Sequence, residues 1–146
     1  ITICAASRRR RNGDYYEYIL ETINKFSDFN VLGHINALDR YIPYIPDFTP
    51  YREIVSEILK LLISRDKGLE INTSSFRYNM GNLTMPSDEI LKMYRELGGT
   101  IITFGSDSHF PEHICYRYDW AMEYLKSFGF NTLTVFENRV PEFVNI

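Results

Sequence analysis

This sequence is poor in the residues that cross-linked and reactive sites use most often. Its 146 residues include two cysteines, Cys4 and Cys115, and three histidines. The cysteines form no CxxC pair, which argues against a disulfide framework and predicts free thiols in a reducing compartment such as the cytoplasm. No apolar run reaches the ~18 residues of a membrane-spanning helix, and there is no signal-peptide pattern. We therefore expect no membrane partner.

Several sequence motifs are missing as well. There is no nucleophile elbow, Walker loop or GxGxxG, so these routes to catalysis or phosphate binding are excluded. The net charge of −3 creates no overall field that would attract nucleic acid. One basic run, 8–11, is interpreted as a solvated loop or frayed terminus, with a phosphate or nucleic-acid patch as the alternative.

The sequence does contain alternating strand and helix patterns. We expect a proline-rich loop around 42–50, and Ser87 as the residue that caps a helix through its hydroxyl. The first predicted helix has an apolar face formed by Tyr16, Ile19, Leu20, Ile23 and Phe26. The predicted strands are 1–5, 29–33, 68–74, 100–104 and 132–137, and the predicted helices are 13–26, 51–68, 88–97 and 118–129.

This alternation predicts an α/β fold of parallel βαβ units in one domain, 1–146. In such folds the active site forms at the carboxyl ends of the strands. Polar side chains stand at three of these ends. They are His34 after the second strand, Glu70, Asn72, Thr73 and Ser74 in and after the third, and Ser106, Asp107 and His109 after the fourth.

The segment Asp107-x-His109 has the pattern of a metal-binding corner. A carboxylate oxygen and an imidazole nitrogen suit zinc, manganese or iron, and His34 is a candidate ligand from another strand. The alternative is a capping aspartate beside a surface histidine. His113, two residues after a proline, is interpreted as a loop residue. Glu70 is expected to point into a barrel interior, where a structural salt bridge and a role in the site are both open.

Two arginines, Arg40 and Arg77, follow the strand ends. A guanidinium group matches the oxygens of a phosphate, so a pair near a metal favours an anionic ligand, although single loop arginines are usually only solvated. The chemistry that fits is metal-assisted hydrolysis of a phosphate ester. The metal polarises the phosphoryl oxygens and activates water, and the arginines hold the phosphate.

Three stretches resemble one known family. "DFNVLGHINALDRY", "GLEINTSSFRY" and "ELGGTIITFGSDSHFPEHI" are similar, in this order, to the polymerase and histidinol phosphatase (PHP) family, and most of all to its histidinol-phosphatase branch. The resemblance runs from about Asp14 to the C-terminus. It implies a distorted (β/α)7 TIM-like barrel with two or three metals at the strand ends.

The resemblance also implies roles for individual residues. His34, Asp107 and His109 match metal ligands, with Asp107 and His109 in the catalytic centre, and Arg40 and Arg77 match arginines that bind the substrate phosphate. The implied reaction is hydrolysis of L-histidinol phosphate in histidine biosynthesis. Asn36 departs from the aspartate that this branch often has there.

A larger departure is that the family's opening His-x-His motif and its further ligands are absent. Because roughly two to four protein ligands are needed per ion, the three candidates hold one ion at most. We therefore expect this chain to be the C-terminal half of such an enzyme, inactive or nearly so alone, with a missing half or a homo-oligomer covering its open edges. The alternatives are another PHP phosphoesterase or nuclease, and a non-catalytic remnant that binds a partner or an anion.

Overall fold

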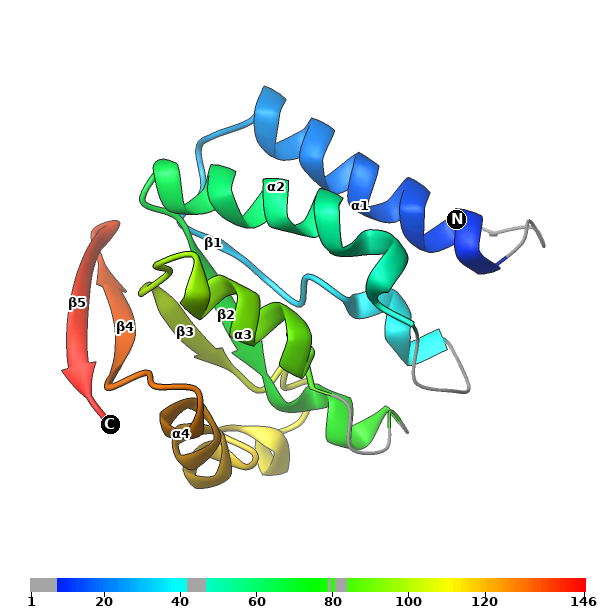
Figure 1. Ribbon diagram of the computed structural model, residues 1–146. Helices are drawn as coiled ribbons and strands as arrows, with labels where there is room; N and C mark the ends of the chain where they lie inside the picture. Colours follow the sequence, from blue (N-terminus) through cyan, green and yellow to red (C-terminus); the bar gives the residue numbers. More distant parts are fainter. Residues whose placement is uncertain (1–7, 42–46, 79, 81–83) are drawn as a thin grey trace.

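Helices and strands alternate through most of the chain, as the sequence predicts (Figure 1). The computed structural model describes residues 8–41, 47–78, 80 and 84–146. The predicted strand 1–5 and much of the proline-rich loop lie outside these residues. The elements are α1 (Arg8–Lys25), β1 (Val31–Leu32), α2 (Arg52–Ser64), β2 (Gly68–Asn72), α3 (Asp88–Glu96), β3 (Ile102–Gly105), α4 (Tyr118–Ser127), β4 (Thr132–Glu137) and β5 (Val140–Asn145), with short 3-10 helices η1 (Ala37–Tyr41), η2 (Thr49–Tyr51), η3 (Thr73–Arg77) and η4 (Pro111–His113).

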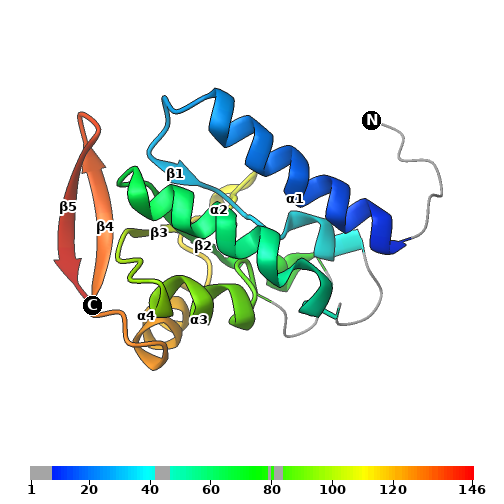
Figure 2. The same ribbon diagram turned by 45° about the horizontal axis from the view of Figure 1, so that its top comes forward.

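The first three strands form a parallel sheet in the order β1-β2-β3. Helices α1, α2 and α3 lie on one side of it, as Figures 1 and 2 both show. Side chains alternate between the two faces of a strand. Leu69 and Ile71 of β2 are fully buried in the core that the helices cover, so Glu70 between them points to the opposite face. The fold is thus α/β with a parallel sheet.

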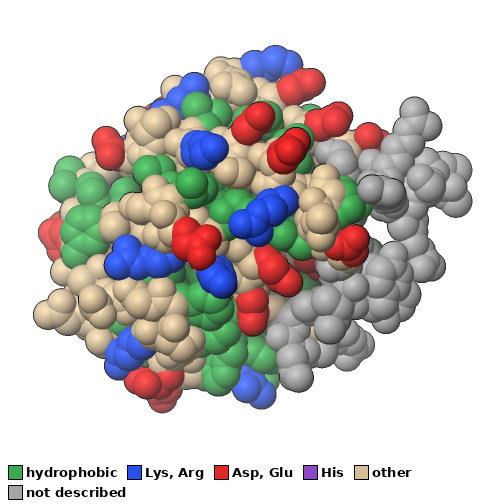
Figure 3. All heavy atoms as spheres, in the orientation of Figure 1, with side chains coloured by type: hydrophobic (Ala, Val, Ile, Leu, Met, Phe, Trp, Pro, Cys, Tyr) green, Lys and Arg blue, Asp and Glu red, His purple; other side chains and the backbone are tan. Residues whose placement is uncertain are grey.

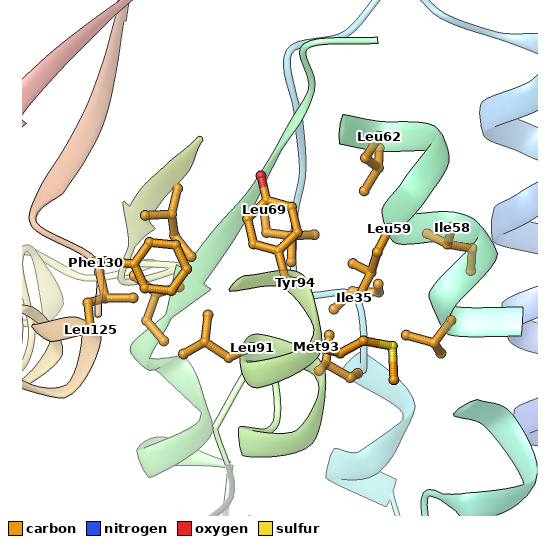
Figure 4. Close-up of a cluster of buried hydrophobic side chains, with 14 of the residues drawn as sticks. Ile35, Ile58, Leu59, Leu62, Leu69, Leu91, Met93, Tyr94, Leu125 and Phe130 are labelled. Atoms are coloured by element: carbon orange, nitrogen blue, oxygen red, sulfur yellow. The ribbon is translucent and has the colours of Figure 1, made fainter. Parts of the chain in front are cut away.

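The hydrophobic core fills the layer between the sheet and the helices (Figure 4). Leu69 on β2 lies beside Tyr94 of α3, and Leu59 and Leu62 approach from α2. The Tyr94 hydroxyl donates a hydrogen bond of 2.9 Å to the Ile101 carbonyl, which satisfies a polar group inside the core. Apolar burial on this scale fixes the sheet against α2 and α3.

Three expectations about the ends of helices are corrected. The run 8–11 forms the first turn of α1 and not a loop, because arginine is a good helix former and continues directly into an amphipathic segment. Phe26 follows the end of α1 and is 54% exposed, although Tyr16, Ile19 and Ile23 are buried as predicted. Ser87 does stand at the N-cap of α3, but its hydroxyl makes no capping bond.

The last predicted strand is present, but its predicted parallel pairing is wrong. β4 pairs antiparallel with β5, a strand that was not predicted. The turn between them consists of Asn138 and Arg139, both with positive φ (51° and 69°), as a type I′ hairpin turn requires. β5 is exposed along its whole length, so it lacks the buried alternation by which strands are recognised.

Figure 3 shows one face of the molecule, in which positive and negative side chains are interspersed. This face has no large patch of one charge among the described residues, and no histidine is visible on it. Within the described part of the chain, none of the helices is long and apolar enough to cross a membrane.

Candidate active site at the strand ends

The turns that follow β1 and β3 share an unusual backbone conformation. His34 has φ of 29° and Asp107 has φ of 47°, whereas non-glycine residues rarely adopt positive φ. Because β1 and β3 both flank β2 in parallel, these turns leave the same end of the sheet. Such strained residues concentrate at functional sites, so the backbone supports the strand-end location that the sequence predicts.

The structure brings Asp107 and His109 together. Asp107 Oδ1 lies 3.9 Å from His109 Nε2, and the two side chains are 31% and 71% exposed. An accessible oxygen and nitrogen at this separation fit two donors to one divalent cation. Among the described residues, no three His, Cys, Asp or Glu side chains lie close enough together to hold a metal ion, so the exposed His34 does not complete this pair.

Arg77 connects η3 with the turn that carries this pair. One of its amines, Nη2, donates hydrogen bonds to the main-chain carbonyls of Ser106 (2.7 Å) and Asp107 (2.9 Å). The other amine, Nη1, is buried and has no partner among the described residues. A buried, unpaired guanidinium nitrogen is costly, so it is a candidate donor to a bound anion.

Arg40 contacts an aromatic ring at the end of η3. Its guanidinium carbon lies 4.3 Å from the ring centre of Tyr78, the residue that follows Arg77. Its Nη2 is 3.8 Å from the sulfur of Met85, and its Nε is buried without a partner in the described part of the chain. Each of the two predicted arginines therefore has a buried nitrogen without a partner among the described residues.

Tyr78 and Tyr116 were not assigned to this site from the sequence, whereas Thr73 is among the polar side chains predicted at the strand ends. The Thr73 hydroxyl donates to the Tyr116 carbonyl at 2.7 Å and also lies 3.5 Å from the Gly105 carbonyl. The Tyr116 ring is 5.5 Å from the Arg77 guanidinium carbon, and Tyr78 contacts Arg40 as described. The 11 tyrosines and 10 phenylalanines of the sequence are a signal for such contacts, but composition does not indicate which rings make them.

His113, interpreted from the sequence as a loop residue, lies in a short 3-10 helix. It is half-buried at the end of η4, and its ring contacts that of Phe110 edge-on at 5.7 Å. Cys115 is an exposed free thiol, in agreement with the prediction, and Cys4 lies outside the described residues. Neither His113 nor Cys115 joins the Asp107–His109 pair in a metal cluster within the described chain.

Asp39 has a strongly perturbed acidity close to Arg40. Burial raises its pKa to about 6, Glu89 adds to the rise, and a hydrogen bond from the Asn36 amide opposes it. That bond is 2.7 Å long, and the same amide nitrogen also donates to the Thr84 carbonyl at 3.1 Å. Asn36 thus ties the segment after His34 to the loop before α3.

No family model matches the chain, but individual proteins do. A probable histidinol-phosphatase of Thermotoga maritima is 36% identical over 123 residues, which are 84% of this chain and 50% of that protein. The histidinol-phosphatase of Lactococcus lactis is 33% identical over 126 residues, 84% of this chain and 46% of that protein. The chain spans about half the length of the curated relatives it matches.

Solved structures give the same result at the level of the fold. The crystal structure of histidinol phosphate phosphatase from Lactococcus lactis, complexed with zinc, L-histidinol and phosphate, aligns with a TM-score of 0.74 and 27% identity. It covers 95% of this chain, which in turn covers 53% of it. A putative histidinol phosphatase from Listeria monocytogenes aligns with a TM-score of 0.62 at 24% identity, a likeness of fold alone. In sequence and in fold, this chain is similar to one half of a histidinol-phosphatase.

Proposed function

We propose that this chain carries one side of the active site of a metal-dependent phosphomonoester hydrolase whose substrate is L-histidinol phosphate. The relatives described above bear the name histidinol-phosphatase, and one was crystallised with zinc, L-histidinol and phosphate. Because the chain spans about half of these relatives, their activity is carried over to it as a proposal. A cytoplasmic location stays a prediction.

The observation that carries this proposal is the arrangement of Arg77. Its Nη2 holds the Asp107 turn, and its buried Nη1 is unpaired within the described residues. Arg77 thereby contacts the turn that carries the candidate metal-binding pair and also offers a nitrogen that can donate to a phosphate. Arg40, which packs on the Tyr78 ring, has a second buried nitrogen without a partner among the described residues. Two guanidinium groups can bind the phosphate dianion and stabilise the charge that builds up during its transfer.

In the proposed site, Asp107 and His109 bind the metal, and His34, which does not cluster with them among the described residues, joins as a further ligand when the site is completed. We propose zinc by similarity to the Lactococcus lactis structure, with manganese and iron as further candidates for this mixed oxygen and nitrogen set. A bound divalent ion supplies Lewis-acid polarisation of the phosphoryl oxygens and lowers the pKa of water. Asp107 and His109 thus define the catalytic centre, and Arg40 and Arg77 orient the phosphate beside it.

The proposed architecture is the C-terminal part of a distorted (β/α)7 barrel. Its support is a parallel sheet with helices on one side and the charged side chain of Glu70 on the other. Three candidate ligands are too few for the two or three metals of a complete site, so we propose that groups outside 1–146 complete it. They come from an N-terminal half or from another subunit.

The test is phosphate release from L-histidinol phosphate in the presence of zinc. The protein to assay is a chimera of this chain with the part of the Lactococcus lactis histidinol-phosphatase that lies outside the matched region. We expect the chimera to be active. We also expect Asp107→Asn to reduce kcat/KM by more than about 100-fold, beyond the roughly 10- to 100-fold typical of residues that only support a ligand.

The matched control is Glu57→Gln, an exposed change on α2 that leaves activity as it is. A zinc-loaded chimera that is folded but inactive supports the non-catalytic alternative. Cleavage of single-stranded DNA in preference to the phosphomonoester supports the nuclease alternative. Activity that survives Asp107→Asn contradicts the proposed site.

A further inference from the structure

Glu70 occupies the centre of the sheet on the face opposite the helices. It pairs in register with Thr103 of β3, and its neighbours in β2 are buried on the other side. No ion pair of Glu70 is found within the described part of the chain, so the salt-bridge interpretation open at the level of sequence has no support there. This half-buried carboxylate needs another explanation.

Two glycines make room for the Glu70 side chain. A Cβ atom on Gly105 would overlap Glu70 Oε1, and a Cβ atom on Gly33 would lie 3.3 Å from Glu70 Oε2. Gly33 precedes His34, and Gly105 lies two residues before Asp107. The carboxylate therefore lies across the sheet, between the strand ends that carry the predicted ligands.

The carboxylate uses this position to bind the turn after β1. Glu70 Oε2 accepts a hydrogen bond from the main-chain N–H of His34 at 3.3 Å and another from Asn72 Nδ2 at 3.0 Å. Asn72 Oδ1 in turn accepts from the N–H of Ser74 at 2.9 Å, at the start of η3. A hydrogen-bonded chain thus links the His34 turn, through Glu70, to the helix that carries Arg77.

His34 needs such support because its backbone is strained. Its φ of 29° is unfavourable for a residue with a Cβ atom, and such conformations persist only where neighbouring groups enforce them. The bond to Glu70 is a polar contact that acts on this residue's own amide. Asp107 is supported in a similar way, through its carbonyl, by Arg77.

We infer that Glu70 is a positioning residue that holds the His34 turn so that the imidazole is directed at the metal. This inference rests on the proposed function, in which His34 is a ligand. Glu70 acts through its reach, by placing an acceptor next to the His34 amide, and not through its charge. Residues that orient ligands in this way typically change metal affinity by roughly 10- to 100-fold.

Two conservative substitutions separate reach from charge. Glu70→Gln keeps an oxygen at the same distance and removes the charge, whereas Glu70→Asp keeps the charge and shortens the side chain. Zinc titration of the full chain, followed by 15N–1H NMR, measures the affinity of each variant even when binding is weak. We expect Glu70→Asp to weaken zinc binding by about 10-fold or more and Glu70→Gln to stay near the unmodified chain.

The result that overturns the inference is any other order of the two variants. Equal affinities, an equal loss in both, or a larger loss in Glu70→Gln each mean that reach to His34 is not what matters. Glu57→Asp on the exposed side of α2 is the matched control, and thermal unfolding of all variants separates a loss of fold from a loss of positioning.

A third variant separates failure of this inference from failure of the proposed function. If His34→Ala leaves zinc affinity unchanged, His34 is not a ligand and the proposed site is wrong in that respect. If His34→Ala weakens zinc binding, we expect Glu70→Asp to cause no further loss in that background. In the metal-free chain, the chemical shift of the His34 amide tests the hydrogen bond to Glu70 directly. It moves further in Glu70→Asp than in Glu70→Gln, and the reverse order contradicts the inference.

Discussion

At the scale of single residues, the strand-end site depends on polar side chains whose partners are main-chain atoms. Arg77 binds two carbonyls, Thr73 binds another, and Glu70 binds an amide. Such bonds fix the path of a loop as well as the side chain itself. Side chains of β2 and η3 therefore stabilise the loops that form the site.

Asp39 provides a prediction about pH at this scale. Its raised pKa of about 6 means that the folded state binds its proton more tightly than the unfolded state does. The stabilisation from this proton is complete below about pH 4 and is lost as the pH rises through about 6. Asp39→Asn keeps an oxygen for the Asn36 amide and cannot ionise.

We therefore expect Asp39→Asn to match the unmodified chain at pH 4 and to exceed it at pH 8 by about 2 to 3 kcal/mol of unfolding free energy. Urea unfolding across this pH range measures the difference. Asp119→Asn, an exposed change on α4, is the control and alters stability little at either pH. A constant difference between pH 4 and pH 8 contradicts the assignment.

At the scale of elements, the helices depend on β2 as their common support. Leu69 is fully buried under side chains of α2 and α3 (Figure 4). Leu69→Ala removes three buried carbon atoms and leaves a cavity, so we expect a loss of about 2 to 5 kcal/mol in unfolding free energy. Val140→Ala on the exposed β5 is expected to change it by less than about 0.5 kcal/mol. Denaturant unfolding compares the two, and similar losses contradict this description of the core.

A side chain on β4 hydrogen-bonds to the main chain of β3. Thr134, buried on β4, accepts a hydrogen bond of 3.3 Å from the Ile102 main-chain N–H through its hydroxyl. Thr134→Val keeps the shape and leaves that amide unpaired, which costs about 1 to 3 kcal/mol. Faster hydrogen exchange of the Ile102 amide checks the cause directly.

The control for this prediction is Thr132→Val, two residues earlier on β4, where no such bond is found in the described chain. We expect it to leave the Ile102 amide unchanged. Equal exchange rates at Ile102 in the Thr134→Val variant and the unmodified chain mean that the hydroxyl is not its partner.

The sequence predicts well those features that depend on local patterns. Helical spacing identified the buried Tyr16, Ile19 and Ile23. The position of Asp107 and His109 after an apolar run indicated a strand-end pair. β5 was missed because none of its residues is buried, so period-two alternation of burial is absent. Its turn, Asn138-Arg139, also lacks the glycine that usually signals a hairpin.

The sequence does not predict the contacts between strands. Which groups Glu70 touches depends on the neighbours of β2 in the sheet and on the space beside Gly33 and Gly105. Arg77 binds the main chain of residues 106–107 with one nitrogen and leaves the other unpaired among the described residues. This arrangement depends on the path of residues 106–107. Neither follows from the order of residues along the chain alone.

At the scale of the whole molecule, the site is one-sided. Polar groups gather at one end of a three-stranded sheet, and the described residues contain no cluster of three metal-binding side chains. The similarity to histidinol-phosphatases covers about half of their length. We therefore expect the chain alone to bind zinc weakly and to release little phosphate from L-histidinol phosphate.

The most direct test of the central claim is the stoichiometry and location of zinc on the chain as given. The titration is followed by NMR for the unmodified chain and for Asp107→Asn. We predict at most one zinc ion per chain, with resonance shifts centred on Asp107 and His109, and an affinity at least about 10-fold weaker in Asp107→Asn. Binding of two or more ions per chain, or zinc binding that Asp107→Asn leaves unchanged, contradicts the account.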